Sequence, residues 1–369
     1  IGSPWRGRPN RSPHHRRPCG RGRLLPRPDG QASPRARREH AFAPVRRAQR
    51  GVGHQPSHSR IAGAGGQPCA GVSGEVRRGT GPWPSANVEP EVRRWLLSRL
   101  DSVEVEEREG MALRLMEHES GQPRGARLAE GRRWSESELD RLAVRASRLA
   151  EGEPLQHVLG QAWFDGIALR VTPDVLIPRP ETEELSAWMA QKLLTVPHSA
   201  PCALDWCTGS GCIALSLKKR VPHAEVHAWD VSRPALDVAQ ANAEALGLNV
   251  TTGESDLLSA PRPSAPFHLV VSNPPYIPVA ECADMHARVV EHEPALALFV
   301  TDEDPLLFYH ALVRWCEDGG LSKEGWLGME SHHAHAQGVA ALLADSGRWK
   351  HVEILEDLQG KPRHVVARL

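Results

Sequence analysis

The sequence lacks the long apolar segments that membrane-inserted and secreted proteins need. It contains no run of about 18 apolar residues and no apolar segment of the signal-peptide kind. Its seven cysteines include no C-x-x-C pair and no zinc-site spacing, which favours a reduced compartment. We therefore expect a cytoplasmic protein.

Lysine is absent from the first 82 residues, which hold 17 arginines and only three acidic residues. The rest of the chain carries 28 basic and 42 acidic side chains, so the net charge of zero conceals a basic and an acidic part. Proline and glycine supply 25 of those 82 residues, so residues 1–86 are expected to form a disordered leader. The first methionine is Met111, and translated upstream sequence is therefore one interpretation of the leader. An arginine-rich arm that binds RNA is the other.

The most informative motif is Asn273-Pro274-Pro275-Tyr276, which follows an apolar, strand-like run at 267–272. The Asn273 side-chain oxygen and the Pro274 carbonyl offer two acceptors to a planar NH2 group, whose delocalised lone pair is a poor nucleophile. The prolines stiffen this geometry, and Tyr276 offers a flat face for stacking. We assign catalysis to Asn273, Pro274 and Tyr276, and substrate binding to all four residues. The motif thus predicts methylation at nitrogen, with a plain Pro-Pro turn as the alternative.

A second motif, residues 203–215, is typical of a strand, a turn of small residues and the start of a helix. Its glycines let the backbone approach a ligand, and free N–H groups at the helix start favour a polar ligand group. It is not a phosphate loop, because it lacks the Gly-Lys-Ser/Thr ending and has Cys207 in place of the first glycine of G-x-G-x-x-G. We interpret it as a nucleotide-cofactor loop. The candidate contacts are Asp205, Cys207, Thr208, Gly209, Ser210 and Gly211.

Two aspartates follow this loop at the ends of later segments. Asp230 closes the strand-like run 225–230, about 20 residues beyond the loop, which is the spacing at which doubly wound folds bind ribose hydroxyls. Asp256 follows the next short segment and is a candidate for the adenine amino group. Because the loop, both aspartates and Asn273 come at successive strand ends, we expect them at one carboxyl edge of a sheet. Asn273 is therefore assigned to the cofactor as well as to the substrate.

Together these motifs resemble a class I S-adenosylmethionine-dependent methyltransferase, and more closely the HemK-type (PrmC) release factor glutamine N5-methyltransferases. The likeness covers about residues 87–369 and includes the segments 153–160 and 175–185. Many family members have glycine at the position of Cys207. The resemblance implies an α/β, Rossmann-like fold: a mainly parallel seven-stranded sheet with a C-terminal antiparallel hairpin, and a small N-terminal helical domain.

The resemblance also implies a reaction. A methyl group would pass from S-adenosylmethionine to the side-chain amide nitrogen of the glutamine in the Gly-Gly-Gln motif of a peptide chain release factor. Leu257 would pack near adenine, and Arg179 would line the substrate entrance. We expect a monomer whose partner is the release factor, with no direct contact to nucleic acid or membrane.

Three alternatives stay open. A glutamine of a ribosomal protein is one, and adenine N6 in DNA or RNA is another, although the folded part of the chain is acidic and nucleic-acid binding normally brings a basic surface. The non-enzymatic alternative is an RNA-binding protein that uses the arginine-rich leader. It leaves the constellation at 203–276 unexplained.

The predicted organisation has three parts after the leader. Residues 87–158 are expected to be helical and, by the resemblance, to dock the protein substrate. Residues 159–174 are expected to form a hairpin linker, and 175–369 a methyltransferase domain of alternating strands and helices. Its predicted strands are 203–206, 226–230, 267–272 and 325–330, its predicted helices end at residue 220 or span 234–246 and 305–316, and 351–355 is expected to pair with 364–369 in an antiparallel hairpin. The candidate helices of the first part are 89–100, 104–118 and 135–150.

The third of these helices begins with the capping-box pattern Ser135-x-x-Glu138, and its apolar residues recur at helical spacing.

A histidine-rich stretch near the C-terminus, His332-His333-Ala334-His335, suggests a metal site. No carboxylate or cysteine at ligand spacing follows it, and methyl transfer needs no metal, so we predict none. These histidines are expected in an exposed loop or at a helix start.

Overall fold

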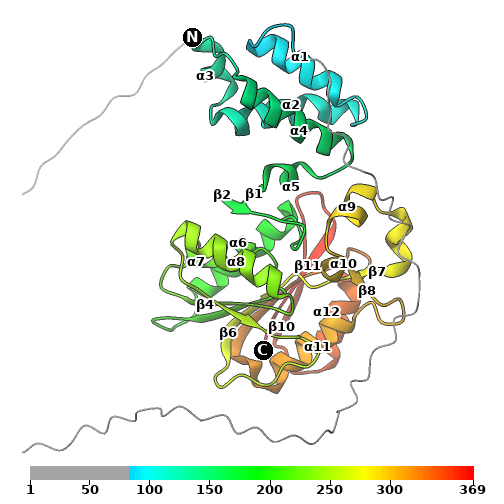
Figure 1. Cartoon of the computed structure of the whole chain (residues 1–369). Helices are drawn as coiled ribbons and strands as arrows, with labels where there is room; N and C mark the ends of the chain where they lie inside the picture. Colours follow the sequence, from blue (N-terminus) through cyan, green and yellow to red (C-terminus); the bar gives the residue numbers. More distant parts are fainter. Residues whose placement is uncertain (1–82) are drawn as a thin grey trace, which may run out of the picture. The chain divides into compact units, whose positions relative to one another are not determined.

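A computed structural model describes residues 83–369, and the predictions made for residues 1–82 lie outside this range (Figure 1). The described chain begins with helices that share one apolar core, formed around Leu96, Leu115 and Leu142. These helices are α1 (Glu89–Arg99), α2 (Val105–Ser120), α3 (Arg124–Ala129), α4 (Glu136–Ala150) and α5 (Leu155–Leu159).

The start of α4 shows how local sequence fixes this part of the fold. Ser135 caps the helix, and the side chain of Glu138 accepts a hydrogen bond from the Ser135 backbone N–H at 2.8 Å. The predicted capping box is therefore confirmed. The apolar residues at helical spacing are all buried: Leu139, Leu142, Ala146 and Leu149.

Helix α3 was not predicted, and its anchor is a buried ion pair rather than an apolar stripe. Arg127 is fully buried and its guanidinium donates to the Glu89 carboxylate at 2.8 Å, which joins α3 to the start of α1. A six-residue helix with Gly125 near its start has little intrinsic stability, so tertiary contacts determine it. Helix α5 was missed for the same reason.

The predicted hairpin is confirmed as β1 (Gln161–Phe164) paired with β2 (Ile167–Arg170). Asp165 and Gly166 form its two-residue turn, both with positive φ, which is why Asp-Gly suits this place. The Asp165 carboxylate also accepts a hydrogen bond from Ser216 Oγ at 2.6 Å and so ties the turn to helix α7 (Cys212–Arg220).

The centre of the fold is a seven-stranded sheet with the order β10-β11-β9-β6-β3-β4-β5. Neighbouring strands are parallel from β9 to β5, whereas β11 runs antiparallel to both of its neighbours. The predicted fold, a mainly parallel seven-stranded sheet with a C-terminal antiparallel hairpin, is confirmed. Its strands are β3 (Cys202–Trp206), β4 (Glu225–Asp230), β5 (Val250–Glu254), β6 (Phe267–Ser272), β9 (Leu321–Glu330), β10 (His351–Glu356) and β11 (Pro362–Arg368).

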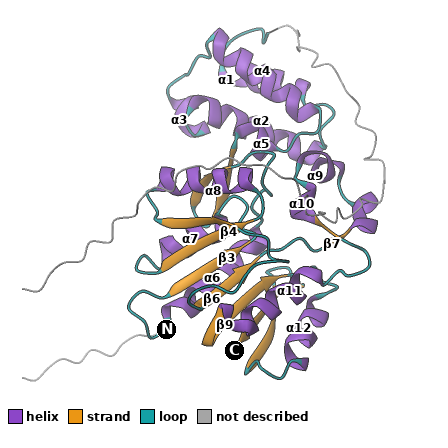
Figure 2. Cartoon of the chain, turned by 60° about the horizontal axis from the view of Figure 1, so that its bottom comes forward, coloured by secondary structure: helices purple, strands orange, loops and turns teal. Residues whose placement is uncertain are grey.

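Helices cover both faces of this sheet (Figure 2). Side chains of β3 alternate between two apolar clusters: Ala203 packs with the helices on one face, and Leu204 with those on the other. The first face is covered by α6 (Pro180–Leu194), α7 and α8 (Arg233–Leu246), and the second by α11 (Leu307–Trp315) and α12 (Ala336–Asp345).

Three of these elements, α6, β5 and α12, were absent from the predicted alternation. Strand β5 lies at the sheet edge and pairs with β4, and Val250 is its one strongly apolar residue. Helix α12 contains Gly338, which weakens the helical pattern.

Among residues 83–369, no helix is long and apolar enough to cross a membrane.

After β6, residues 277–300 form a small group of elements outside the main sheet. It contains a two-stranded parallel pair that lies apart from the main sheet. Its elements are β7 (Ile277–Pro278), the 3-10 helix η1 (Val279–Asp284), α9 (Ala287–His292), α10 (Ala295–Leu298) and β8 (Phe299–Val300).

Candidate active site

A cavity of about 980 Å³, a value that includes space open to solvent, lies where the parallel strands β3, β4 and β6 end. Most of the predicted site residues line it. They are Arg179, Cys207, Thr208, Gly209, Ser210, Asp230, Asp256, Leu257, Asn273 and Pro275.

Four predicted residues do not line this cavity. Asp205 is fully buried beneath the loop, and Gly211 is the N-cap of α7. Pro274 is buried, and the half-buried Tyr276 turns its hydroxyl to the Glu330 carboxylate. Asp205 and Gly211 therefore stabilise the conformation of the loop without lining the cavity. The stacking role predicted for Tyr276 stays a prediction.

The turn between β3 and α7 needs backbone conformations that favour glycine. Gly209 and Gly211 have φ of 52° and 80°, and a Cβ on Gly211 would lie 3.1 Å from the Ala239 side chain. Cys207 also has a positive φ, 57°, which costs a residue with a side chain about 1–2 kcal/mol. This explains why glycine suits the position at which the sequence has Cys207.

Asp205 anchors this turn from below. Its Oδ2 accepts hydrogen bonds from the Thr208 hydroxyl at 2.6 Å and from the Ala214 N–H at 3.0 Å. Its Oδ1 has no hydrogen-bond partner within residues 83–369. Burial raises the pKa of Asp205 to about 7, against the opposing effect of these two hydrogen bonds.

This raised pKa predicts a pH-dependent contribution to stability. Between the ordinary pKa of 3.8 and about 7, the folded protein keeps a proton on Asp205 that the unfolded chain releases. The free energy of unfolding therefore falls as pH rises through this window, by up to about 4 kcal/mol for this group. Asp205→Asn removes the titration, so its stability should rise relative to the unmodified protein between pH 4 and pH 7. Urea unfolding at several pH values measures this, and a constant difference would contradict it.

Asp230, at the end of β4, is mostly buried at the cavity wall, with 9% of its surface exposed. Its Oδ2 accepts from the Gly209 N–H at 2.9 Å, and its Oδ1 from the Ser232 N–H at 2.9 Å. Burial raises its pKa, and these backbone hydrogen bonds lower it. The carboxylate thus holds the loop in place, and each oxygen keeps a further lone pair for a ligand.

Asp256 and Leu257 lie together after β5. The Asp256 carboxylate accepts hydrogen bonds from the Leu258 N–H and the Ser259 hydroxyl, both at 2.9 Å, and so closes its own turn. Leu257 is 6% exposed and belongs to the apolar cluster on one face of the sheet while lining the cavity. This pair gives the cavity a polar and an apolar contact side by side.

Asn273, directly after β6, is held by a chain of hydrogen bonds. Its side-chain NH2 donates to the Thr182 hydroxyl at 3.3 Å, and that hydroxyl donates to Glu330 Oε2 at 2.6 Å. The Tyr276 hydroxyl donates to the other oxygen, Glu330 Oε1, at 3.3 Å. The Thr182 hydroxyl has one proton, and it donates this proton to Glu330. The hydroxyl oxygen of Thr182 is therefore left to accept the hydrogen bond from the Asn273 NH2. The amide oxygen of Asn273 is thereby left for the cavity.

Glu330 is fully buried at the end of β9, and burial raises its pKa, although the hydrogen bond from Thr182 opposes the rise. Neither residue was predicted as part of the site. Thr182 lies within the motif 175–185, which was the available signal, whereas Glu330 only ends a predicted strand. It is 148 residues from Thr182 in sequence.

Arg179 lines the cavity but is held by a partner that the sequence did not reveal. Its guanidinium lies 2.5 Å from Glu293 Oε1, and Glu293 Oε2 accepts from the Ile177 N–H at 2.9 Å. Glu293 is 6% exposed and precedes Pro294, which lines the cavity. The pair therefore joins two segments of the cavity wall.

Two family models match the chain: the PrmC N-terminal domain over residues 91–160 and the methyltransferase small domain over residues 186–294. A release factor glutamine methyltransferase of Bacteroides thetaiotaomicron is 40% identical over 221 residues, which cover 60% of this chain and 77% of the relative. The chain belongs to the release factor glutamine methyltransferase family. The enzyme of that description from Deinococcus radiodurans is also 40% identical, over 65% of this chain and 80% of its own length.

Among solved structures, the release-factor-specific protein-(glutamine-N5) methyltransferase of Alicyclobacillus acidocaldarius is 27% identical. The match covers 54% of this chain and 98% of the solved chain, with a TM-score of 0.33. The curated relatives confirm the family predicted from the motifs, and the protein is a methyltransferase.

Proposed function

We propose that this protein transfers a methyl group from S-adenosylmethionine to the side-chain amide nitrogen of the glutamine in the Gly-Gly-Gln motif of a peptide chain release factor. The names of its relatives support this substrate. The observation that carries the proposal is the orientation of Asn273, whose amide oxygen is left free at the cavity by the hydrogen bond of its NH2 to Thr182. An amide oxygen at this place suits an NH2 group of the substrate.

The residues at the strand ends fit S-adenosylmethionine. The loop Cys207–Gly211 would hold its methionine end through backbone groups, Asp230 its ribose and Leu257 its adenine. Asp230 is preorganised for this role, because two backbone hydrogen bonds fix its carboxylate. When bound, S-adenosylmethionine supplies an electrophilic methyl group on a sulfonium.

Asn273 and Pro274 would act on the target nitrogen. An amide nitrogen is a poor nucleophile because its lone pair is delocalised into the carbonyl. Asn273 Oδ1, which faces the cavity, would hold one N–H group, and the carbonyl oxygen of Pro274, which is buried behind the cavity wall, would take the other when substrate binds. Both would stabilise the positive charge that develops on nitrogen as the nitrogen–carbon bond forms and the carbon–sulfur bond of the sulfonium breaks. The methylated nitrogen then loses one proton to water. No strong base is required for this step, since the nitrogen becomes more acidic as it gains the methyl group.

The hydroxyl of Thr182 is predicted to position Asn273. Thr182→Val keeps the shape but removes both hydrogen bonds, so we expect turnover to fall on the order of tenfold to a hundredfold at saturating cofactor. Thr182→Ser should keep most activity, and both variants should bind S-adenosylmethionine within a few fold of the unmodified protein. Turnover and calorimetric titration measure these effects. Unchanged turnover in the valine variant would show that Asn273 is held by other means.

The helices of residues 87–158 are proposed to form a separate substrate-docking domain, joined by the hairpin 159–174 to the methyltransferase domain 175–369. The match of residues 91–160 to the PrmC N-terminal domain supports this division. An ion pair between Glu107 of α2 and Arg288 of α9, at 3.0 Å, connects the helical part with the segment that follows the catalytic motif.

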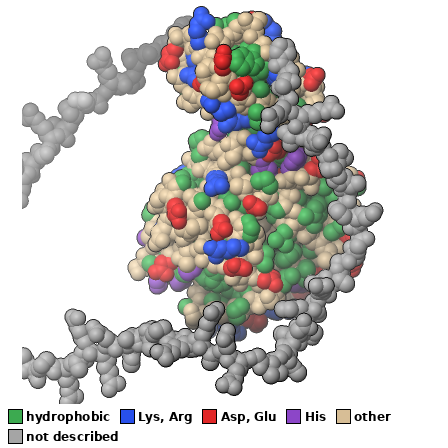
Figure 3. Space-filling model, viewed as in Figure 1, with side chains coloured by type: hydrophobic (Ala, Val, Ile, Leu, Met, Phe, Trp, Pro, Cys, Tyr) green, Lys and Arg blue, Asp and Glu red, His purple; other side chains and the backbone are tan. Residues whose placement is uncertain are grey.

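Adenine in nucleic acid is the second candidate substrate, and surface charge speaks against it. Residues 83–369 carry 28 basic and 42 acidic side chains, and on the face shown in Figure 3 acidic and basic side chains are interspersed. The test is transfer of a labelled methyl group to a panel of acceptors. We expect label in folded release factor and none in single-stranded or duplex DNA. Label in DNA with none in release factor would overturn the glutamine assignment.

A further inference from the structure

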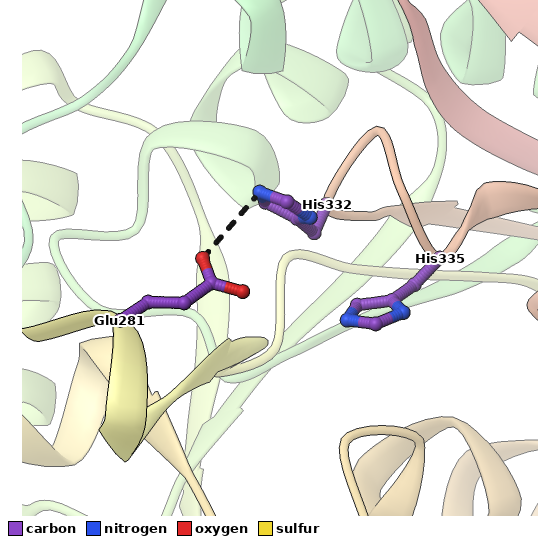
Figure 4. A group of neighbouring side chains, drawn as sticks. All are labelled: Glu281, His332 and His335. Atoms are coloured by element: carbon purple, nitrogen blue, oxygen red, sulfur yellow. Dashed lines mark ion pairs between the residues drawn. The ribbon is translucent and has the colours of Figure 1, made fainter. Parts of the chain in front are cut away.

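Outside the proposed active site, the side chains of Glu281, His332 and His335 converge (Figure 4). Glu281 lies in η1, whereas the two histidines lie in the turn between β9 and α12. One possible ligand atom of each residue lies within 4.8 Å of those of the other two. All three side chains are half-buried, so the cluster is open to ions from solvent.

These separations are close to those of a metal site. Zinc bonds of about 2.0–2.2 Å place tetrahedral ligand atoms about 3.5 Å apart. The distance from His332 Nε2 to Glu281 Oε2 is already 3.8 Å. Small changes in side-chain torsion angles, which shorten separations of at most 4.8 Å to about 3.5 Å, would therefore bring the three atoms to bonding distance of one ion.

The backbone fixes the two histidines relative to each other. The His335 N–H donates to the His332 carbonyl at 2.9 Å, which closes a turn at the start of α12. His335 Nε2 is a buried atom with no hydrogen-bond partner within residues 83–369. A buried imidazole nitrogen without a partner is energetically unfavourable, and a ligand bond would satisfy it.

One contact has to change when an ion binds through His332 Nε2. His332 Nδ1 accepts from the Ala334 N–H at 3.4 Å, so the proton of the neutral ring is on Nε2 in this arrangement. Metal binding at Nε2 would move that proton to Nδ1. The contact it would break is long and weak, and its loss costs little.

We propose that Glu281, His332 and His335 form a binding site for a divalent transition-metal ion, zinc being the best match. Two imidazoles and one carboxylate suit zinc, and they leave a coordination position for water. Magnesium is a poor match, because it prefers oxygen ligands in octahedral geometry.

No carboxylate or cysteine follows the histidines at ligand spacing in the sequence, which is why no metal site was predicted there. Glu281 instead precedes them by about 50 residues, and only the fold brings it near. The exposed neighbour His333 is outside the cluster. It offers a matched control for the two histidines that are inside.

The location gives the ion a structural consequence. Helix η1 begins three residues after Tyr276 of the catalytic motif, and His332 follows Glu330 by two residues. The rings of Tyr276 and His332 have centroids 6.4 Å apart. A bound ion would therefore connect the segment after the catalytic motif to the end of β9.

Titration of the full chain with zinc or cobalt(II) tests this site. We expect binding by calorimetry, an upward shift in melting temperature and a cobalt absorption spectrum typical of nitrogen and oxygen ligands. His335→Gln and Glu281→Gln should each weaken binding at least about tenfold and abolish the melting shift, while His333→Gln stays within about twofold. Magnesium at the same concentration should produce no shift.

The comparison between variants decides the outcome, because residues 1–82 contain further histidines and imidazole is a common metal ligand. Equal affinity in His335→Gln, Glu281→Gln and His333→Gln would overturn the proposal, as would a cobalt spectrum dominated by thiolate ligands. The two ligand substitutions lie on different segments, so a folding defect in one leaves the other as the test. Methyl transfer is not part of this readout, which keeps it independent of the proposed function.

Discussion

Asn273→Ala is expected to lower turnover on the order of 10² to 10³ while changing the affinity for S-adenosylmethionine only a few fold. The substitution removes the oriented amide oxygen that stabilises charge on the target nitrogen, and loss of one preorganised polar contact usually costs this much. The Thr182 hydroxyl and Glu330 would remain in place beneath it. Turnover at saturating cofactor, together with a calorimetric dissociation constant, measures the two effects separately.

Two further variants make this test specific. Asn249→Ala, at an exposed position, controls for unspecific loss and should retain full turnover. Asn273→Asp keeps an acceptor, but its carboxylate would be partly desolvated in the cavity wall and would tend to take up a proton, so partial activity at best is expected. Full activity of Asn273→Ala would remove this residue from the catalytic site.

Asp230→Ala is expected to weaken S-adenosylmethionine binding by about 2 to 4 kcal/mol, because a preorganised carboxylate loses its hydrogen bonds to the ribose. The structure adds a second reason: the same carboxylate holds the Gly209 N–H and the Ser232 N–H, so the loop also loses its support. Calorimetric titration measures the affinity, and circular dichroism checks the fold.

Asp230→Asn separates these two contributions, since its amide oxygen can still accept one of the backbone hydrogen bonds. Asp237→Ala is a suitable control, because Asp237 lies exposed on the neighbouring helix α8 and pairs with Arg233 on the same helix. We expect the control to bind normally. A folded Asp230→Ala protein with an unchanged dissociation constant would contradict the assignment of Asp230.

The predicted parts of the site are those that follow from short segments of sequence. The loop after β3, Asp230 after β4 and Asn273 after β6 each stand at a strand end. Parallel strands bring their carboxyl ends to one edge. The order of the motifs along the chain was therefore enough to predict that these residues line one cavity.

The missed parts depend on pairings between distant segments. Thr182 contacts Glu330 across 148 residues, and Arg179 contacts Glu293 across 114 residues. Local sequence periodicity does not encode such pairs. Each partner, taken alone, is an ordinary polar residue near the end of a helix or strand, and nothing near it in the sequence indicates its distant partner. The short helices α3 and α5 were missed for a related reason, since packing and not propensity stabilises them.

Tandem mass spectrometry of a release factor incubated with this protein and S-adenosylmethionine tests the proposed reaction most directly. We expect one added methyl group, on the side-chain nitrogen of the Gly-Gly-Gln glutamine, and none when the Asn273→Ala variant is used. A methyl group on another residue, or an unmodified release factor alongside methylated ribosomal protein or nucleic acid, would contradict it.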